Sequence, residues 1–147
     1  VALISMRGQR AELLIPPTGS VDTAERSMRN MPVGGKTPLS HGLLLAYEVL
    51  SRERARHPES KLLLVLMTDG RGNVSAAGGK PMAEARGAAS AIREAGIDCI
   101  VIDTEEGGLS LGMAKGLAEA SGGKYIKLEN LEGGAIAEAA KTAVRRR

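Results

Sequence analysis

Aromatic side chains are almost absent from this chain of 147 residues, which contains two Tyr and neither Phe nor Trp. Hydrophobic residues still make up 43% of the sequence, so a packed core can form from Leu, Ile, Val, Met and Ala. A chain with so few aromatics offers no stacking surface for nucleic-acid bases. The composition therefore argues against a protein that binds single-stranded nucleic acid.

Cysteine is almost as scarce, because Cys99 is the only one in the chain. One thiol rules out an intrachain disulfide and suits a reducing compartment, so we expect a cytoplasmic location. No apolar run approaches the roughly 20 residues that a membrane-spanning helix needs, and no signal peptide is visible. Val1 already belongs to a predicted strand, so we expect the natural N-terminus to lie upstream of it.

A large net charge is also lacking. The chain has 20 Lys and Arg against 17 Asp and Glu, a formal charge of +3, and the three arginines at 145–147 account for all of it. A basic tail can bind nucleic acid or an acidic partner. The simpler interpretation is a row of cations at the end of a helix, where they complement the helix dipole.

Strands and helices are predicted to alternate along the chain. Two short apolar runs, at residues 1–6 and 11–15, flank a polar break that contains Gly8 and predict a hairpin. Hydrophobic periodicity and helix-ending residues then predict the remaining elements. Helices are expected at 20–31, 38–56, 81–95, 111–120 and 134–144, and strands at 62–67, 98–103 and 125–128.

Such alternation predicts an α/β fold. We expect a three-layer, mostly parallel, doubly wound sheet with one antiparallel edge strand. The continuous apolar run at 62–67 indicates a strand buried on both faces. In sheets of this kind ligands bind outside the carboxyl ends of the strands, so the loops at that edge are the first place to look for a site.

Two glycine-containing segments resemble phosphate-binding motifs only in part. Residues 35–37 (Gly-Lys-Thr) end like a P-loop, but the required earlier glycine is Asn30, and a helix precedes the loop where the motif needs a strand. Residues 70–72 (Gly-Arg-Gly) resemble part of a dinucleotide fingerprint, but position 75 is Ser. The sequence therefore predicts no cofactor-binding residue of either type.

Catalytic residues are equally hard to find. His57 precedes a proline in a charged segment and is expected to be exposed. His41 lies one helical turn beyond Thr37, so it either faces the same crevice or is an ordinary residue at a helix end. No Cys–His or His–carboxylate pair has the spacing of a metal site, and no nucleophile elbow is present. We identify no catalytic residue.

Thr37 and Asp69 form the strongest candidate site. Both are predicted on loops at the carboxyl edge of the sheet, and a hydroxyl and a carboxylate are hard oxygen ligands that suit Mg²⁺. If both bind one ion, their side-chain oxygens should lie within about 8 Å of each other. The residues alone leave open a simpler interpretation, in which Thr37 caps a helix and Asp69 forms a turn before Gly70.

Three segments together resemble the von Willebrand factor A-type (VWA) domain family. Residues 33–39 (Val-Gly-Gly-Lys-Thr-Pro-Leu) are similar to its Gly-Gly-x-Thr-x-Leu loop. The apolar strand followed by residues 68–70 (Thr-Asp-Gly) is similar to the central strand and its metal-site Asp, and residues 117–125 to the segment before the last strand. The particular sequences of residues 16–18, 35–39 and 68–73 narrow the resemblance to the D subunit of magnesium or cobalt chelatases.

The resemblance implies a single VWA-like domain over residues 1–147, incomplete at its N-terminus because the first strand and helix are missing. It also implies a metal-ion-dependent adhesion site made of an Asp-x-Ser-x-Ser loop, a Thr and an Asp. Thr37 and Asp69 match the last two, whereas the loop would precede Val1. The complete domain would hold Mg²⁺, and we expect this chain to bind it weakly or not at all.

The partners implied by the resemblance are an ATPase subunit and a large porphyrin-binding subunit. Together they form a ligase that uses ATP to insert Mg²⁺ or Co²⁺ into a tetrapyrrole, with this domain as a non-catalytic scaffold for adhesion. Two alternatives stay open. The domain could belong to another complex with a MoxR-type ATPase, or the chain could be a small self-contained α/β enzyme that uses Asp69. The choice between magnesium and cobalt is also open.

The missing first strand would lie between the strands at 1–6 and 62–67. These two strands could pair directly, a second copy of the chain could fill the slot, or the missing segment could be present elsewhere in the molecule. An open apolar edge invites another strand. We therefore expect a homo-oligomer that forms through the incomplete sheet.

Overall fold

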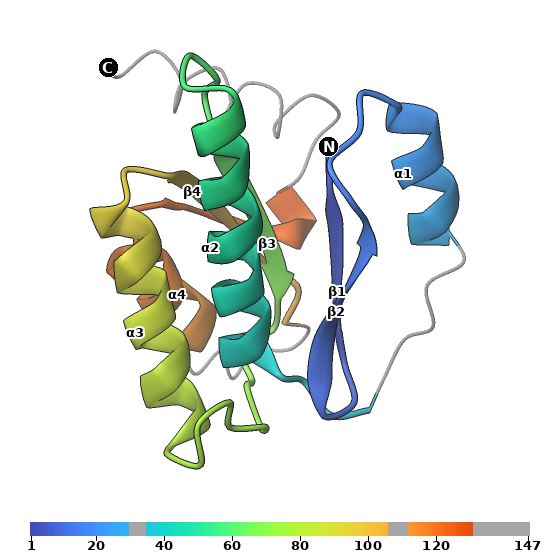
Figure 1. Ribbon diagram of the computed structural model, residues 1–147. Helices are drawn as coiled ribbons and strands as arrows, with labels where there is room; N and C mark the ends of the chain where they lie inside the picture. Colours follow the sequence, from blue (N-terminus) through green and yellow to red (C-terminus); the bar gives the residue numbers. More distant parts are fainter. Residues whose placement is uncertain (30–34, 106–111, 131–147) are drawn as a thin grey trace.

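The computed structural model describes residues 1–29, 35–105 and 112–130 (Figure 1). The elements are β1 (Leu3–Arg7), β2 (Arg10–Ile15), α1 (Val21–Arg29), α2 (Leu39–Arg56), β3 (Leu63–Thr68), α3 (Pro81–Glu94), β4 (Asp98–Asp103), α4 (Met113–Ser121), β5 (Lys124–Lys127) and a 3₁₀ turn (Leu128–Asn130). The helix predicted at 134–144 lies outside the described residues. Within the described ranges, no helix is both long and apolar enough to cross a membrane.

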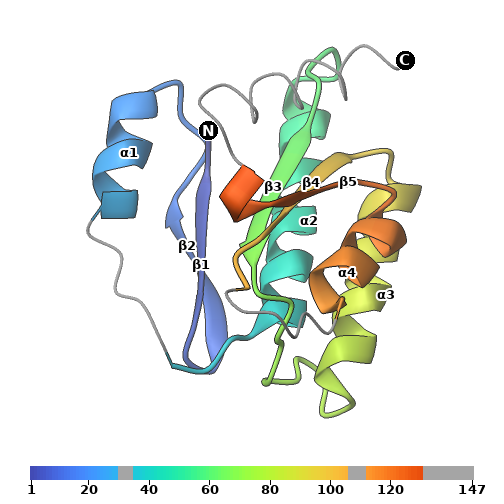
Figure 2. The same ribbon diagram turned by 180° about the vertical axis from the view of Figure 1, so that it is seen from behind.

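A parallel sheet in the order β3-β4-β5 forms one half of the molecule. Figures 1 and 2 show α2, α3 and α4 together on one side of it. The main core lies between these helices and the sheet, and its largest fully buried members include Leu39 of α2, Ile92 of α3, Val101 of β4 and Leu117 of α4. The predicted α/β class with parallel strands is therefore confirmed.

The opposite face of this sheet is covered unevenly. Ile100 and Ile102 of β4 are fully buried there, with Leu63 packed against them. Val65 and Met67 of β3 are 39% and 53% exposed. The prediction that this strand is buried on both faces is wrong, because β3 lies at the edge of the parallel sheet and its alternate side chains point away from the helices.

The predicted hairpin is confirmed, since β1 and β2 pair antiparallel through a turn at Gly8 and Gln9. Gly8 has a φ of 80°, and a positive φ at the first turn residue is what this kind of two-residue hairpin turn requires. The pair forms a sheet of its own. Among the described strands, β1 and β3 do not pair, so the possibility that they close the slot directly is excluded.

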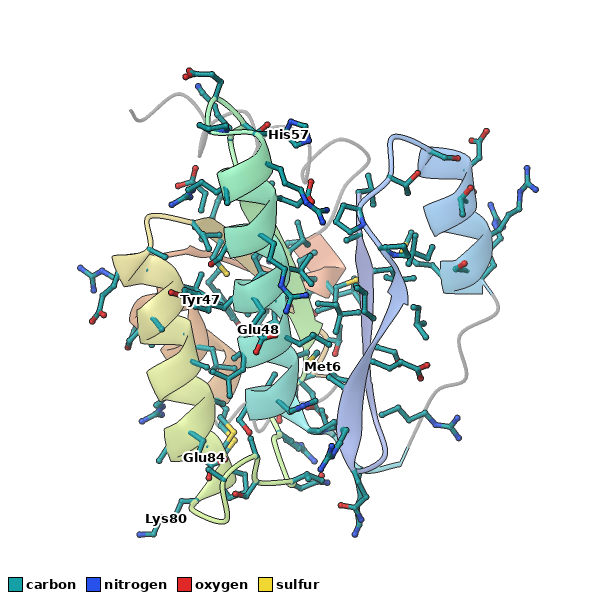
Figure 3. All side chains as sticks on the ribbon, in the orientation of Figure 1. Met6, Tyr47, Glu48, His57, Lys80 and Glu84 are labelled. Carbon is teal, nitrogen blue, oxygen red and sulfur yellow. The ribbon has the colours of Figure 1, made fainter. Side chains whose placement is uncertain are left out.

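Side-chain packing and a hydrogen bond between a backbone N–H and a side chain hold the hairpin against α2. The backbone N–H of Ala11 in β2 donates to Nδ1 of His41 in α2 at 2.8 Å. Met6 of β1 packs against the main core and lies so close to Gly42 that a Cβ on Gly42 would overlap its Sδ. Figure 3 labels Met6 where the hairpin faces α2. His41 therefore anchors the hairpin, whereas His57 follows the end of α2 and is exposed.

Candidate metal and docking site

Two loops meet at the carboxyl edge of the parallel sheet. The backbone N–H of Thr37, just before α2, donates to Oδ1 of Asn73 at 2.8 Å. In return the backbone N–H of Asn73, in the loop after β3, donates to the carbonyl oxygen of Thr37 at 3.2 Å. This reciprocal pair uses only backbone atoms of Thr37. Its hydroxyl is therefore left for another partner.

The interpretation of Thr37 as a helix cap is wrong. Pro38, expected at the first helical position, is instead the N-cap residue, with no side-chain cap bond, and α2 begins at Leu39. An N-cap carbonyl accepts the first bond within the helix, and here Gly42 donates to the carbonyl of Pro38 at 2.9 Å. The carbonyl of Thr37 is already bonded to Asn73, so the helix starts one residue later.

Asp69 directly follows β3 and does shape the turn there. Its Oδ1 accepts the backbone N–H of Arg71 at 2.8 Å, and the hydroxyl of Thr68 accepts the N–H of Gly70 at 3.0 Å. The turn-forming interpretation of Asp69 is therefore confirmed. It does not exclude metal binding, because the side chain is 43% exposed and this bond uses only one of its two oxygens. The other oxygen, Oδ2, lies 4.0 Å from Nε of Arg71.

Gly70 fixes the position of this turn against α4. Its φ is 77°, and a Cβ at this position would lie 2.5 Å from the backbone nitrogen of Ala114 and 2.6 Å from Cβ of Met113. A residue with a side chain would be strained by the positive φ and would push the loop off the helix. The close approach therefore explains why glycine follows Asp69.

A chain of polar contacts links the loop after β3 to the end of β4 and to β5. Arg71 Nη2 donates to Oε1 of Glu105 at 2.9 Å, and the Glu105 side chain is only 7% exposed. This hydrogen bond is the main reason that the pKa of Arg71 is raised. Asp103 accepts the N–H of Glu105 at 2.9 Å and the hydroxyl of Tyr125 at 2.6 Å. The second bond raises the pKa of Tyr125 to about 12.

The donor set fits part of a magnesium site. The Thr37 hydroxyl and the Asp69 carboxylate are hard oxygens, but Mg²⁺ favours about six ligands in octahedral geometry. Among the described residues, no group of three or more His, Cys, Asp or Glu side chains could hold a metal. The guanidinium of Arg71 beside Asp69 also opposes a cation. Thr37 and Asp69 could thus supply two ligands, and water or other groups would have to supply the rest.

Asn73 is the site residue that sequence reasoning missed. It follows Asp69 by four positions in a glycine-containing loop, which is a weak local signal for a side chain that crosses to another loop. His41 was a possible neighbour of the site, but its Nδ1 is engaged by the hairpin instead. The separation of the Thr37 and Asp69 side-chain oxygens stays a prediction.

Comparison with known proteins identifies the fold family. A model of the von Willebrand factor type A domain matches residues 1–71. The structure superimposes on the crystal structure of the SpRpn10 VWA domain with a TM-score of 0.64 at 12% identity, covering 96% of this chain and 70% of that one. The chain belongs to the VWA domain family.

Sequence relatives place this VWA domain close to those of chelatase subunits. The magnesium-chelatase 67 kDa subunit of Chlorobaculum parvum is 40% identical over 95% of this chain. An uncharacterized protein of Methanocaldococcus jannaschii, MJ0910, is 34% identical over 97% of this chain and 82% of its own length. The chain spans about a quarter, 24%, of the length of the chelatase subunit. What the whole subunit does is therefore a matter for proposal.

Proposed function

We propose that this VWA domain is a non-catalytic docking module of a metal-chelatase D-type subunit. The observation that carries the proposal is the reciprocal bonding of Thr37 and Asn73, which joins the loop of one predicted ligand to the loop of the other. Neither these bonds nor the bond from the Arg71 N–H to Asp69 Oδ1 uses the Thr37 hydroxyl or Asp69 Oδ2. Similarity to magnesium-chelatase subunits supports the choice of complex.

The resident ion of the complete site would be Mg²⁺, held in part by Thr37 and Asp69. When bound, it would supply a positive centre with an open position for a carboxylate of the partner. The chain's own contribution is orientation. Asn73 holds the Thr37 loop in place, and Gly70 and Thr68 hold the turn that presents Asp69.

The partners in this proposal are the ATPase subunit and the large porphyrin-binding subunit of a chelatase that inserts Mg²⁺ or Co²⁺ into a tetrapyrrole with ATP. We place the complex in the cytoplasm, where the buried thiol of Cys99 would stay reduced. We also propose that copies of the chain associate through the unpaired edges of β1 and β3. Light scattering at micromolar concentration should then show a dimer or larger species, and a 15.3 kDa monomer would refute the association.

The docking role is tested by Mg²⁺-dependent binding. Each purified chelatase subunit would be titrated against the chain in millimolar Mg²⁺ and again in EDTA. We expect binding that is lost in EDTA and in Asp69→Asn or Thr37→Val, and that survives in Asp22→Asn, a matched change of an exposed carboxylate on α1. Binding that ignores both EDTA and Asp69→Asn would contradict the proposal.

Two further measurements on the purified chain and its variants test the alternatives, which are a complex with a MoxR-type ATPase and a self-contained enzyme. If a MoxR-type ATPase binds in a Mg²⁺- and Asp69-dependent manner and the chelatase subunits do not, the docking role stands but the complex is a different one. If the chain alone hydrolyses ATP or a phosphate ester, and Asp69→Asn abolishes this activity, the chain is an enzyme and the docking proposal is wrong.

A further inference from the structure

Glu84, in the first turn of α3, accepts hydrogen bonds from an unusual number of groups. The hydroxyl of Ser75 donates to Oε1 at 2.7 Å, and the backbone N–H groups of Ala76 and Gly79 donate at 2.7 and 2.8 Å. The hydroxyl of Ser40 donates to Oε2 at 3.3 Å. Figure 3 labels Glu84 at the N-terminal end of α3, beside the loop that precedes this helix.

These donors come from both sides of the candidate metal site. Ser40 is fully buried in the first turn of α2, three residues after Thr37. Ser75 lies two residues after Asn73, in the loop that begins at Asp69. One carboxylate therefore links the two segments that carry the Thr37–Asn73 pair, and it does so from a third element, α3.

Capping of α3 explains only part of this arrangement. A carboxylate in the first turn of a helix is favoured by the helix dipole and by nearby N–H groups, which accounts for the bond to Gly79. It does not account for the bond to Ser40, which comes from another helix. The bonds, that of Ser75 first, lower the pKa of Glu84 to about 2. The carboxylate is thus ionised at neutral pH and can accept from all of its donors.

We infer that Glu84 is a positioning residue of the candidate site. It holds the start of α2, which directly follows the Thr37 loop, against the loop from Asp69 to Gly79 by accepting bonds from Ser40 on one side and from Ser75 and its neighbours on the other. The effect of this coupling on metal binding rests on the proposed function. The loop coupling itself does not, because it concerns only contacts within the chain. Without the carboxylate, the two segments would keep the hydrogen bonds between Thr37 and Asn73 and the packing of Gly72 on Leu39, but they would open more often.

Amide hydrogen exchange of the whole chain, followed by NMR, tests the coupling. In Glu84→Ala we expect exchange at Thr37 and Asn73 to accelerate about tenfold, the size expected for the loss of a charge-assisted hydrogen bond. Buried amides of β4 report global unfolding, and they should accelerate by no more than the loss of overall stability that urea denaturation measures for the same variant. Glu84→Gln, which keeps an acceptor oxygen, should restore part of the protection. Glu94→Gln, at the exposed end of the same helix, is the matched control and should change nothing.

Ser40→Ala separates positioning from capping, because it removes only the bond from α2. We expect faster exchange at Thr37 and Asn73 with Ala76 and Gly79 unchanged. If Glu84→Ala and Ser40→Ala both leave Thr37 and Asn73 protected, Glu84 is a local cap and the inference is overturned. Metal binding is measured separately, as the paramagnetic broadening of amide signals when Mn²⁺, which takes the same hard oxygen ligands as Mg²⁺, is added to the unsubstituted chain. Its absence at Thr37 and Asp69 counts against the proposed function, whereas the exchange rates alone decide the coupling.

Discussion

The two parts of the molecule that border α2 are held together in different ways. In the parallel sheet, β4 pairs on both sides and its Ile100, Val101 and Ile102 are fully buried. The hairpin is a separate sheet, tied to the rest by side-chain packing and by isolated bonds such as Gly8 N–H to the Lys36 carbonyl at 3.0 Å. Thr37 follows directly on Lys36, whereas Asp69 directly follows β3. The candidate site therefore lies across the boundary between a part joined by strand pairing and a part attached to α2 mainly by side-chain packing.

This difference implies that the site depends on contacts that cross the boundary. Substitutions on the parallel side should unfold the whole chain, whereas substitutions on the hairpin side should release one part. The two kinds of effect are easiest to tell apart where a single backbone position or a single side chain makes the contact that is changed. Three changes test it, in order of decreasing expected effect.

The largest effect is expected for Gly70→Ala, on the parallel side. The new Cβ combines a positive φ with a backbone contact at 2.5 Å, and such strain and overpacking should together lower the free energy of unfolding by roughly 2–4 kcal/mol. Urea denaturation measures this. The control is Gly87→Ala in α3, where a Cβ meets nothing within 4 Å, and which should stabilise the helix by up to about 1 kcal/mol. Equal effects of the two changes would refute the account of Gly70.

A smaller and more local effect is expected for His41→Leu. The substitution removes the acceptor of the Ala11 N–H, and an unsatisfied buried donor costs about 1–3 kcal/mol. We expect amides of β1 and β2 to exchange through an opening of lower free energy than the global unfolding that amides of β4 report. His57→Leu, at an exposed position, serves as the control. Uniform loss of protection across both sheets would show that the hairpin and the parallel sheet unfold as one unit.

The smallest effect is a pH dependence that comes from Glu84. Its pKa is about 2 in the fold against an ordinary value of 4.5, so the ionised form is favoured by folding. Its contribution to stability should be complete above pH 4.5 and should fade as the pH falls toward 2. The difference in unfolding free energy between the unsubstituted chain and Glu84→Gln should shrink over that window. A difference that stays constant from pH 6 to pH 2.5 would contradict the pKa assignment.

The elements themselves could be predicted because their signals are local. Apolar periodicity marks the helices and strands, Pro81 marks the start of α3, and the left-handed glycines Gly96 and Gly122 follow the ends of α3 and α4. The predicted boundaries therefore lie within a few residues of the observed ones. The exposure of Met67 could not be predicted, since an apolar run does not tell which strand lies at a sheet edge. The position of Thr37 on a loop was predictable, whereas the start of α2 after Pro38 depends on a bond to a distant loop.

The contacts that build the site are the ones that sequence reasoning cannot supply. Asn73 is 36 residues from Thr37, and Glu84 is 44 residues from Ser40. Side chains so far apart meet only because α2 and α3 pack side by side on the sheet. The sequence could name two hard oxygen ligands from a family resemblance. It could not name the residues that position them, because no local spacing records a tertiary contact.

The account depends most on Thr37 and Asp69 sharing one cation, and paramagnetic broadening by Mn²⁺ tests this directly. Mn²⁺ takes the same hard oxygen ligands as Mg²⁺. We expect the amides of Thr37 and Asp69 to broaden first, with an apparent affinity weaker than about 100 μM because the chain supplies too few ligands. The broadening should vanish in Asp69→Asn and persist in Asp22→Asn. Broadening that leaves Thr37 sharp, or that survives in Asp69→Asn, would contradict the shared site.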